Sequence, residues 1–252
     1  MLITVLTQFP EMFENILNSS ILEKAMEKGL IEFRVINIRD YTADKHNRTD
    51  DTPFGGGAGM VMTPQPAFDA LYQNGASGKR TLYMSPRGKM LSLDLAEDLA
   101  SEDELFILCG HYEGIDQRII DAFNMEEVSI GDYILTGGEL PAMVLIDAVS
   151  RLIPGVLSSE ESSLDESIYS GLLESDTYTK PRVYEGMEVP DVLFSGNHKL
   201  IHLWKFENSL RLTKERRPDL FEAYLQSGKT KDLSKDEKKV LDTVLSSDKN
   251  IE

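Results

Sequence analysis

Cysteine, tryptophan and long apolar runs are scarce in this sequence. Its 252 residues include one cysteine, Cys109, which excludes an intramolecular disulfide and a zinc site built from several cysteines. No window holds the roughly 18 consecutive apolar residues that a membrane-spanning helix needs. The amino terminus also lacks the positive start and apolar stretch of a secretory signal peptide. We therefore expect a cytoplasmic protein with no membrane partner.

Basic residues are in deficit. There are 26 lysines and arginines against 43 aspartates and glutamates, and the formal net charge is −17. Taken alone, this charge argues against a nucleic-acid partner. However, phosphates respond mainly to charges within about 8 Å at physiological salt. Residues 199–231 contain eight lysines and arginines in a helical pattern, beside Trp204, which we expect to be exposed. A local RNA-binding surface is therefore still possible.

Apolar runs alternate with helical patterns through the first 157 residues. Strands are predicted over residues 2–6, 31–38, 81–84, 105–108 and 128–130. Helices are predicted over residues 12–28, 66–72, 93–99 and 117–123. This alternation predicts an α/β domain with a mostly parallel sheet, which binds ligands at the carboxyl ends of its strands.

The remaining chain divides into a helix, a linker and a second domain. Pro141 suits the first position of a helix whose apolar residues surround most of its circumference, so the core or a partner subunit must cover it. Residues 158–177 are rich in serine and acids and contain no lysine or arginine, which predicts a mobile linker. Residues 178–252 are then a small, mostly α-helical domain.

Glycine is concentrated in loops. Four glycines lie within residues 55–59, yet no Gly-Lys-Ser/Thr follows, so this is not a P-loop. Three further turns, at residues 83–88, 109–116 and 130–138, each follow an apolar strand. Backbone groups exposed in such turns can bind an adenine edge and a ribose. The four histidines, His46, His111, His198 and His202, show no metal-ligand spacing, so no metal site is predicted from them.

Several ordered segments carry a family resemblance: PFGGGAGM, CGHYEGID, SIGDYILTGGELPAM, RLIPGVL, GLLESDTYTKP and VPDVLFSGNH. Together they resemble the bacterial tRNA (guanine-N1)-methyltransferases. The resemblance implies a SPOUT fold with a deep trefoil knot, S-adenosylmethionine as methyl donor, and an obligate homodimer whose active site is completed by the second subunit. It also implies a tRNA substrate with guanine at positions 36 and 37, methylated at N1 of guanine 37, and an attributed magnesium dependence.

The resemblance also implies a donor site in the knot loops. The expected residues are Tyr83, Met84, Ser85, Pro86, Gly110, Tyr112, Glu113, Ile130, Gly131, Asp132, Tyr133, Ile134, Leu135, Gly137, Gly138 and Pro141. Glu113 is expected to position the methionine end of the donor or the target guanine. An alternative is that Glu113 caps the next helix.

Methyl transfer to guanine N1 requires a general base for the N1 proton and a cation to stabilise charge on O6. The resemblance assigns the cation to Arg151; otherwise this arginine ends a helix and interacts with its dipole. Glu166 stands where the family has its aspartate base, and Asp165 precedes it. We favour Glu166 and keep Asp165 as the alternative. Because a glutamate stands in place of the family's aspartate, an alternative hypothesis is a catalytically weakened RNA-binding protein. Without the resemblance, a nucleotide-binding enzyme of small-molecule metabolism would be favoured.

Overall fold

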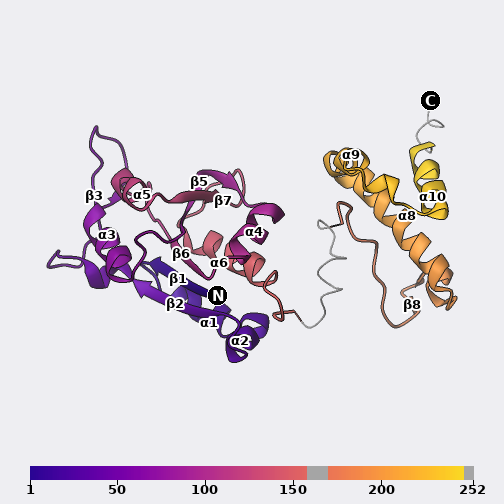
Figure 1. Ribbon diagram of the computed structural model, residues 1–252, viewed down its shortest axis with the longest axis horizontal. Helices are drawn as coiled ribbons and strands as arrows, with labels where there is room; N and C mark the ends of the chain where they lie inside the picture. The colour runs from indigo at the N-terminus through magenta and orange to yellow at the C-terminus, as the bar shows by residue number, and fades with distance from the viewer. Residues whose placement is uncertain (158–169, 247–252) are drawn as a thin grey trace. The chain divides into compact units, whose positions relative to one another are not determined.

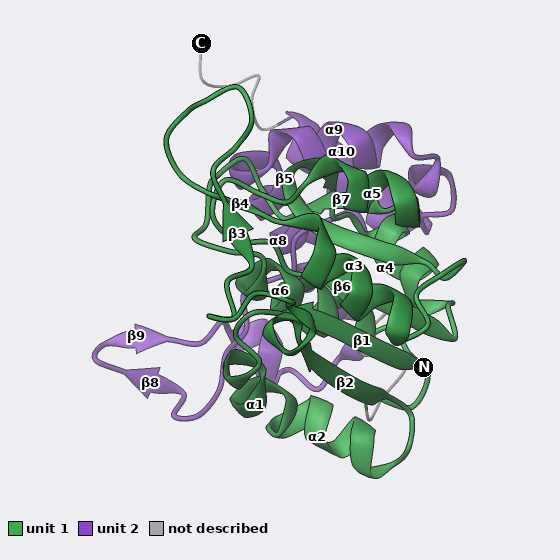
Figure 2. Ribbon diagram, turned by 90° about the vertical axis from the view of Figure 1, so that its left-hand side faces the viewer, with its two compact units in different colours: residues 1–160 green, residues 161–252 purple. Residues whose placement is uncertain are grey.

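The computed structural model describes residues 1–157 and 170–246, which belong to two compact units, Met1–Glu160 and Glu161–Glu252 (Figures 1 and 2). Most of the predicted linker, residues 158–169, lies outside the described residues. Each unit has its own apolar core, so the two are described separately.

Five parallel strands form the sheet of the N-terminal unit (Figure 1). Their order across the sheet is β2 (Glu32–Asn37), β1 (Leu2–Thr7), β6 (Glu104–Leu108), β5 (Thr81–Met90) and β7 (Glu126–Ser129). β1 pairs with β2 and β6, and β5 pairs with β6 and β7. The central strands are nearly continuous apolar runs because both faces of a parallel sheet are covered. The predicted parallel α/β sheet is confirmed.

Helices cover both faces of this sheet. One face packs against α1 (Glu11–Leu17), α2 (Ser20–Glu27), α4 (Leu93–Ala100) and α6 (Glu139–Ser150). The other packs against η1 (Ile38–Tyr41), α3 (Pro64–Gln73) and α5 (Gln117–Phe123). The alternation of β6 divides its side chains, with Ile107 in the first core and Phe106 and Leu108 in the second. All three side chains are fully buried.

The structure differs from the predicted elements at two helices. The single helix expected over residues 12–28 is two helices. Asn18 Nδ2 donates to the Glu14 carbonyl at 2.8 Å, and the Ser19 hydroxyl donates to the Asn15 carbonyl at 2.5 Å. Such local bonds compete with helix continuation. Likewise α6 begins at Glu139, so Pro141 lies inside the first turn, where its missing N–H breaks no helical bond.

The C-terminal unit is a helical bundle with a small hairpin (Figure 2). Its elements are β8 (Val183–Tyr184), β9 (Met187–Glu188), η2 (Asp191–Phe194), α8 (His198–Arg216), α9 (Pro218–Gln226), η3 (Lys229–Lys231) and α10 (Lys235–Ser246). α9 and α10 pack against α8 around Leu210 and Val244, which are fully buried.

Part of the predicted linker belongs to this bundle. Leu172 is buried in the core of the C-terminal unit. The Leu173 amide donates to the Thr213 hydroxyl at 2.8 Å, and the Asp176 amide donates to Asn208 Oδ1 at 2.7 Å. The prediction of a mobile linker up to residue 177 is therefore wrong for residues 170–177. The serine-rich and acidic composition gives no sign that Leu172 is buried and anchors the segment.

No helix among the described residues is long and apolar enough to cross a membrane. Cytoplasmic placement stays a prediction from the sequence.

The start of α10 is fixed by a reciprocal cap that makes stability depend on pH. The Ser234 amide donates to Glu237 Oε2 at 2.8 Å, and the Glu237 amide donates to the Ser234 hydroxyl at 3.3 Å. Hydrogen bonds to the Glu237 carboxylate from the Ser234 side chain, from His202 and from the Ser234 amide lower the pKa of Glu237 to about 2. A depressed folded-state pKa stabilises the fold above the unfolded value of 4.5, and this contribution is lost as the pH falls toward 2.

We expect Glu237→Ala to lower the stability of the C-terminal unit by about 1 kcal/mol at pH 7, because the cap is lost. Hydrogen exchange of the α10 amides in the full chain measures this loss. The matched control is Glu222→Ala on exposed α9 surface, which should leave these amides unchanged. The difference from wild type should shrink as the pH falls from about 4.5 to about 2. A pH-independent loss would contradict the assignment.

Candidate functional site: a cavity at the carboxyl ends of three strands

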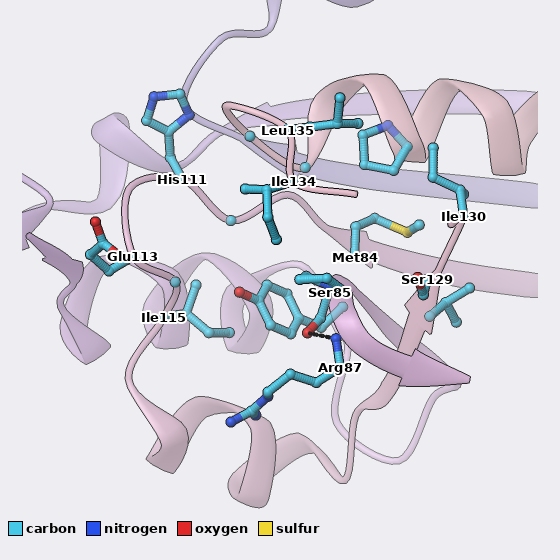
Figure 3. A pocket seen from close by; sticks show the side chains of 18 of the residues that line it. Met84, Ser85, Arg87, His111, Glu113, Ile115, Ser129, Ile130, Ile134 and Leu135 are labelled. Carbon is cyan, nitrogen blue, oxygen red and sulfur yellow. Dashed lines mark hydrogen bonds between the residues drawn. The ribbon is translucent and has the colours of Figure 1, made fainter. Parts of the chain in front are cut away.

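A cavity of about 310 Å³ lies where β5, β6 and β7 end (Figure 3). It is walled by the predicted loops at residues 109–116 and 130–138 and by the segment at residues 83–87. The turn predicted at residues 83–88 is wrong, because these residues lie within β5, at a shift of its register with β7 between Met84 and Lys89. Every residue predicted for the donor site except Asp132 lines the cavity. Sequence reasoning missed the lining residues Arg87, His111, Gly114, Ile115, Gln117, Ile120, Val128 and Ser129. Figure 3 places His111 and Glu113 on one side of the cavity and Ser129 and Ile130 on the other.

Two of these loops touch through their backbones. The Gly138 amide donates to the Gly110 carbonyl at 2.7 Å, and His111 and Gly137 form an antiparallel bridge. A Cβ on Gly138 would lie 2.8 Å from both Cys109 Cα and the Gly110 nitrogen, closer than real Cβ contacts. Glycine is required here because neither backbone can move away. This contact brings the start of α6 against the end of β6.

A buried tyrosine, Tyr83, packs against Gly110 beside an ion pair. Burial, followed by the charge of Glu127, raises the pKa of Tyr83. Burial also raises the pKa of Glu127, but hydrogen bonds from Ser85 and Arg87 outweigh it and hold that pKa below its usual range. Arg87 Nη2 donates to Glu127 Oε1 at 3.0 Å and to Gln117 Oε1 at 3.4 Å. The pair therefore links β5 to β7 beside the cavity.

The glycine-rich segment forms a hairpin against the β6 loop. β3 (Asp50–Asp51) pairs with β4 (Val61–Met62), and the residues between them form the hairpin tip, with the Phe54 side chain fully exposed. The Glu113 amide donates to the Met60 carbonyl at 3.0 Å. A Cβ on Gly59, whose φ is +87°, would lie 2.5 Å from the Glu113 side chain. The hairpin thus extends the cavity wall at Glu113.

Glu113 does not cap the following helix. The N-cap of α5 is Asp116, whose Oδ1 accepts from the Arg118 amide at 3.0 Å. The alternative reading of Glu113 is therefore wrong, and its carboxylate lines the cavity instead.

Arg151 lies at the other end of α6. It is the C-cap residue of this helix, and its amide donates to the Asp147 carbonyl at 3.2 Å. At 1.5 Å per residue, Arg151 is roughly 20 Å along the helix from Gly138. An arginine side chain spans far less, so Arg151 is not brought to the cavity of its own chain. Glu166 and Asp165 lie outside the described residues.

The basic segment of the C-terminal unit is largely paired within the unit. Arg211 pairs with Glu207 at 2.7 Å, and Arg217 with Asp219 at 2.6 Å. Lys199 likewise pairs with Asp236. Trp204, expected to be exposed, is half-buried and its ring lies 6.2 Å from that of Tyr178. The partial burial of this ring corrects the expectation of an exposed tryptophan.

Among residues 1–157 and 170–246, no group of three or more histidine, cysteine, aspartate or glutamate side chains converges to hold a metal ion. Glu113 is the one carboxylate among the side chains that line the cavity in this part of the chain.

A parallel α/β sheet with a cavity at its carboxyl edge, walled by bare-backbone loops, defines a cofactor-binding enzyme of the α/β class. The particular family follows from sequence comparison. The chain belongs to the tRNA (guanine-1)-methyltransferase TrmD family, whose model matches residues 1–223. Membership implies S-adenosylmethionine as the methyl donor.

Individual relatives match over nearly their full lengths. A tRNA (guanine-N(1)-)-methyltransferase of Alkaliphilus metalliredigens is 56% identical over 225 residues, covering 87% of this chain and 91% of the relative. The Clostridioides difficile protein of the same name is 51% identical over 221 residues, covering 86% and 96%. The Bacillus cereus protein is 51% identical over 247 residues, covering 97% and 98%.

We expect Gly138→Ala to weaken S-adenosylmethionine binding at least about tenfold, because the added Cβ forces the Gly110 and Gly138 backbones apart. Isothermal titration calorimetry measures the dissociation constant. The control is Gly78→Ala, in a turn outside the cavity where a Cβ meets nothing within 4 Å although φ is +74°. Equal effects of the two variants would show that strain in general, and not the loop contact, governs binding.

Proposed function

We propose that this chain transfers a methyl group from S-adenosylmethionine to N1 of guanine 37 in tRNAs that carry guanine at positions 36 and 37. The observation that carries the proposal is the cavity at the carboxyl edge of the sheet, because its lining includes every residue expected for the donor except Asp132. Its apolar and backbone surface suits an adenine and a ribose.

The two touching loops support the SPOUT knot. A trefoil knot requires one segment to pass through a loop made by another, and true knots are rare. The backbone contact between Gly110 and Gly138 is the kind of crossing that a knot needs, since two main chains pass without intervening side chains. We infer that the β7–α6 segment passes through the loop that ends β6.

For this reaction the protein must align the methyl donor with guanine N1 and remove the N1 proton. The donor supplies a methyl group already activated by its sulfonium sulfur. The N1–methyl bond forms as the carbon–sulfur bond breaks and its electrons return to sulfur, while the N1 proton goes to a general base. We propose Glu166 as that base, with Asp165 as the alternative, and Arg151 as the cation that stabilises charge on O6.

The position of Arg151 supports a homodimer. The roughly 20 Å between Gly138 and Arg151 means that one chain does not bring its arginine to its own cavity. A second subunit can do so if the α6 helices pack together. Leu140 and Val144 are about half exposed on α6, at 49% and 48%, and Met12 on α1 is 41% exposed. An exposed apolar face of this kind marks an interaction surface.

Glu113 and the glycine hairpin are proposed to receive the target guanine. They extend the cavity wall beyond the donor loops, and exposed Phe54 can stack on an unpaired base. The C-terminal unit would contact the tRNA stem through exposed Lys205 and Arg216. A magnesium ion would find only the Glu113 carboxylate among the described cavity residues, so no step is assigned to it.

We expect Glu166→Gln to lower kcat by about a hundredfold or more, because general base catalysis is worth about 10² to 10⁴. The assay follows labelled methyl transfer to tRNA with guanine 36 and 37, and a tRNA without guanine 37 should give none. S-adenosylmethionine affinity should be unchanged. Asp165→Asn is the matched control and should retain turnover. Full turnover in Glu166→Gln would assign the base elsewhere, and tRNA binding without transfer by wild type would favour a weakened RNA-binding protein.

Subunit mixing tests whether Arg151 acts across the dimer. Arg151→Ala alone should be nearly inactive, and so should Gly138→Ala when the S-adenosylmethionine concentration is kept well below its weakened dissociation constant. Mixed dimers contain one cavity with an intact donor loop facing an intact partner arginine, so co-expression should restore up to about a quarter of wild-type activity. No recovery, in a sample whose mixed dimers are verified by two affinity tags, would mean that the arginine serves its own chain.

A further inference from the structure

Glu139 is a buried carboxylate with too few partners. It is the first residue of α6, and its side chain is 2% exposed. The Thr7 hydroxyl donates to Oε1 at 2.7 Å. The helix amino terminus favours a negative charge here only modestly, whereas burying a charge is costly unless it is paired. One hydroxyl leaves Oε2 in need of a second donor.

Among the described residues, His111 lacks a hydrogen-bond partner at one ring nitrogen. Its Nδ1 is buried and has no hydrogen-bond partner within residues 1–157 and 170–246. The ring lies 5.1 Å from the Phe9 ring and 4.8 Å from the Tyr112 ring, so its orientation is held by packing. It also stands between the donor cavity and a second cavity of about 220 Å³, and lines both. A buried polar atom without a partner requires an explanation.

Gly137 leaves the space between these two groups open. A Cβ built on Gly137 would lie 2.4 Å from Glu139 Oε2 and 2.6 Å from His111 Nδ1. Both atoms therefore border the same small volume, although no hydrogen bond joins them in this structure. A small rotation of the His111 ring or of the Glu139 side chain is needed to bring them into contact. Any side chain at residue 137 would fill this volume. Glycine keeps it free, which a turn alone does not require because the φ of Gly137 is not in the left-handed region.

We propose that the His111 imidazolium and the Glu139 carboxylate pair across the space that Gly137 leaves open, and that this pair holds the two donor loops in their binding arrangement. The imidazolium Nδ1–H donates to Oε2 while Thr7 keeps Oε1. The pair thereby links the β6 loop, the start of α6 and the end of β1. His111 is thus a positioning residue for the methyl donor, and this role rests on the proposed donor site.

The other charged groups nearby do not replace this partner. Burial raises the pKa of the Cys109 thiol well above its usual value, with the charge of Glu139 adding to the shift, so the thiol is neutral. Arg39 lies beyond the Phe9 ring, 5.8 Å from its centre, and its Nη2 donates to Gln8 Oε1 at 2.9 Å. Of the described side chains that these contacts place beside Glu139, which are Thr7, Cys109 and His111, His111 is the one that can supply a charged donor.

A substitution that keeps the positive charge at residue 111 distinguishes the proposed ion pair from a simple packing role of His111. We expect His111→Gln to raise the dissociation constant of S-adenosylmethionine about tenfold, and His111→Arg to stay within about threefold of wild type because it restores a cation. Glu139→Gln should weaken binding as much as His111→Gln. The double variant should be no worse than either single variant, because both remove one interaction. Calorimetry measures all four, with circular dichroism as the folding check.

A spectroscopic readout tests the pair without the donor. Nitrogen-15 NMR of labelled histidine should show His111 Nδ1 as a protonated, hydrogen-bonded nitrogen in wild type and as an unprotonated one in Glu139→Gln. His46, exposed on the surface, is the internal control and should not change. Failure of His111→Arg to rescue, additive losses in the double variant, or an unprotonated Nδ1 in wild type would overturn the proposal. Absence of donor binding in wild type with an intact NMR signature would instead overturn the proposed donor site.

Discussion

The hydrogen bond from the Gly138 amide to the Gly110 carbonyl, at 2.7 Å, is the contact on which the site depends. It holds the loop after β6 and the loop before α6 at backbone distance, which only residues without a Cβ permit. The cavity, the first turn of α6 and the burial of Glu139 all follow from that approach. A substitution that separates the two backbones therefore disturbs three features together.

The parallel sheet places this contact at one edge of the unit. Because β5, β6 and β7 are neighbours and run the same way, their carboxyl ends open into one crevice. Strand pairing and the Arg87–Glu127 ion pair join β5 to β7, while the glycine loops hold the end of β6 against α6. The rigid scaffold thus positions loops that carry little regular structure themselves.

The sequence predicts the strands and the loops well because their signals are local. Apolar runs mark the strands, and glycines mark the turns that end them. The direction in which a side chain points is not encoded in the local sequence pattern. Arg87 and His111 are therefore not predicted as lining residues, although the segments that contain them are predicted to wall the site. Asp132 was included with its motif, yet it does not line the cavity. The same limit explains residues 170–177, where Leu172 outweighs an otherwise polar composition.

A single helix connects the parts of the proposed active site. The start of α6 contributes Gly138 and Pro141 to the donor wall, its middle exposes Val144 as an apolar surface, and its last residue is followed by Arg151. Since a straight helix keeps its ends roughly 20 Å apart, it must deliver the arginine to a cavity other than its own. In the proposed dimer, the same packing of the exposed α6 surfaces that joins the subunits therefore also places Arg151 at the partner's cavity. Catalysis would then depend on association of the subunits.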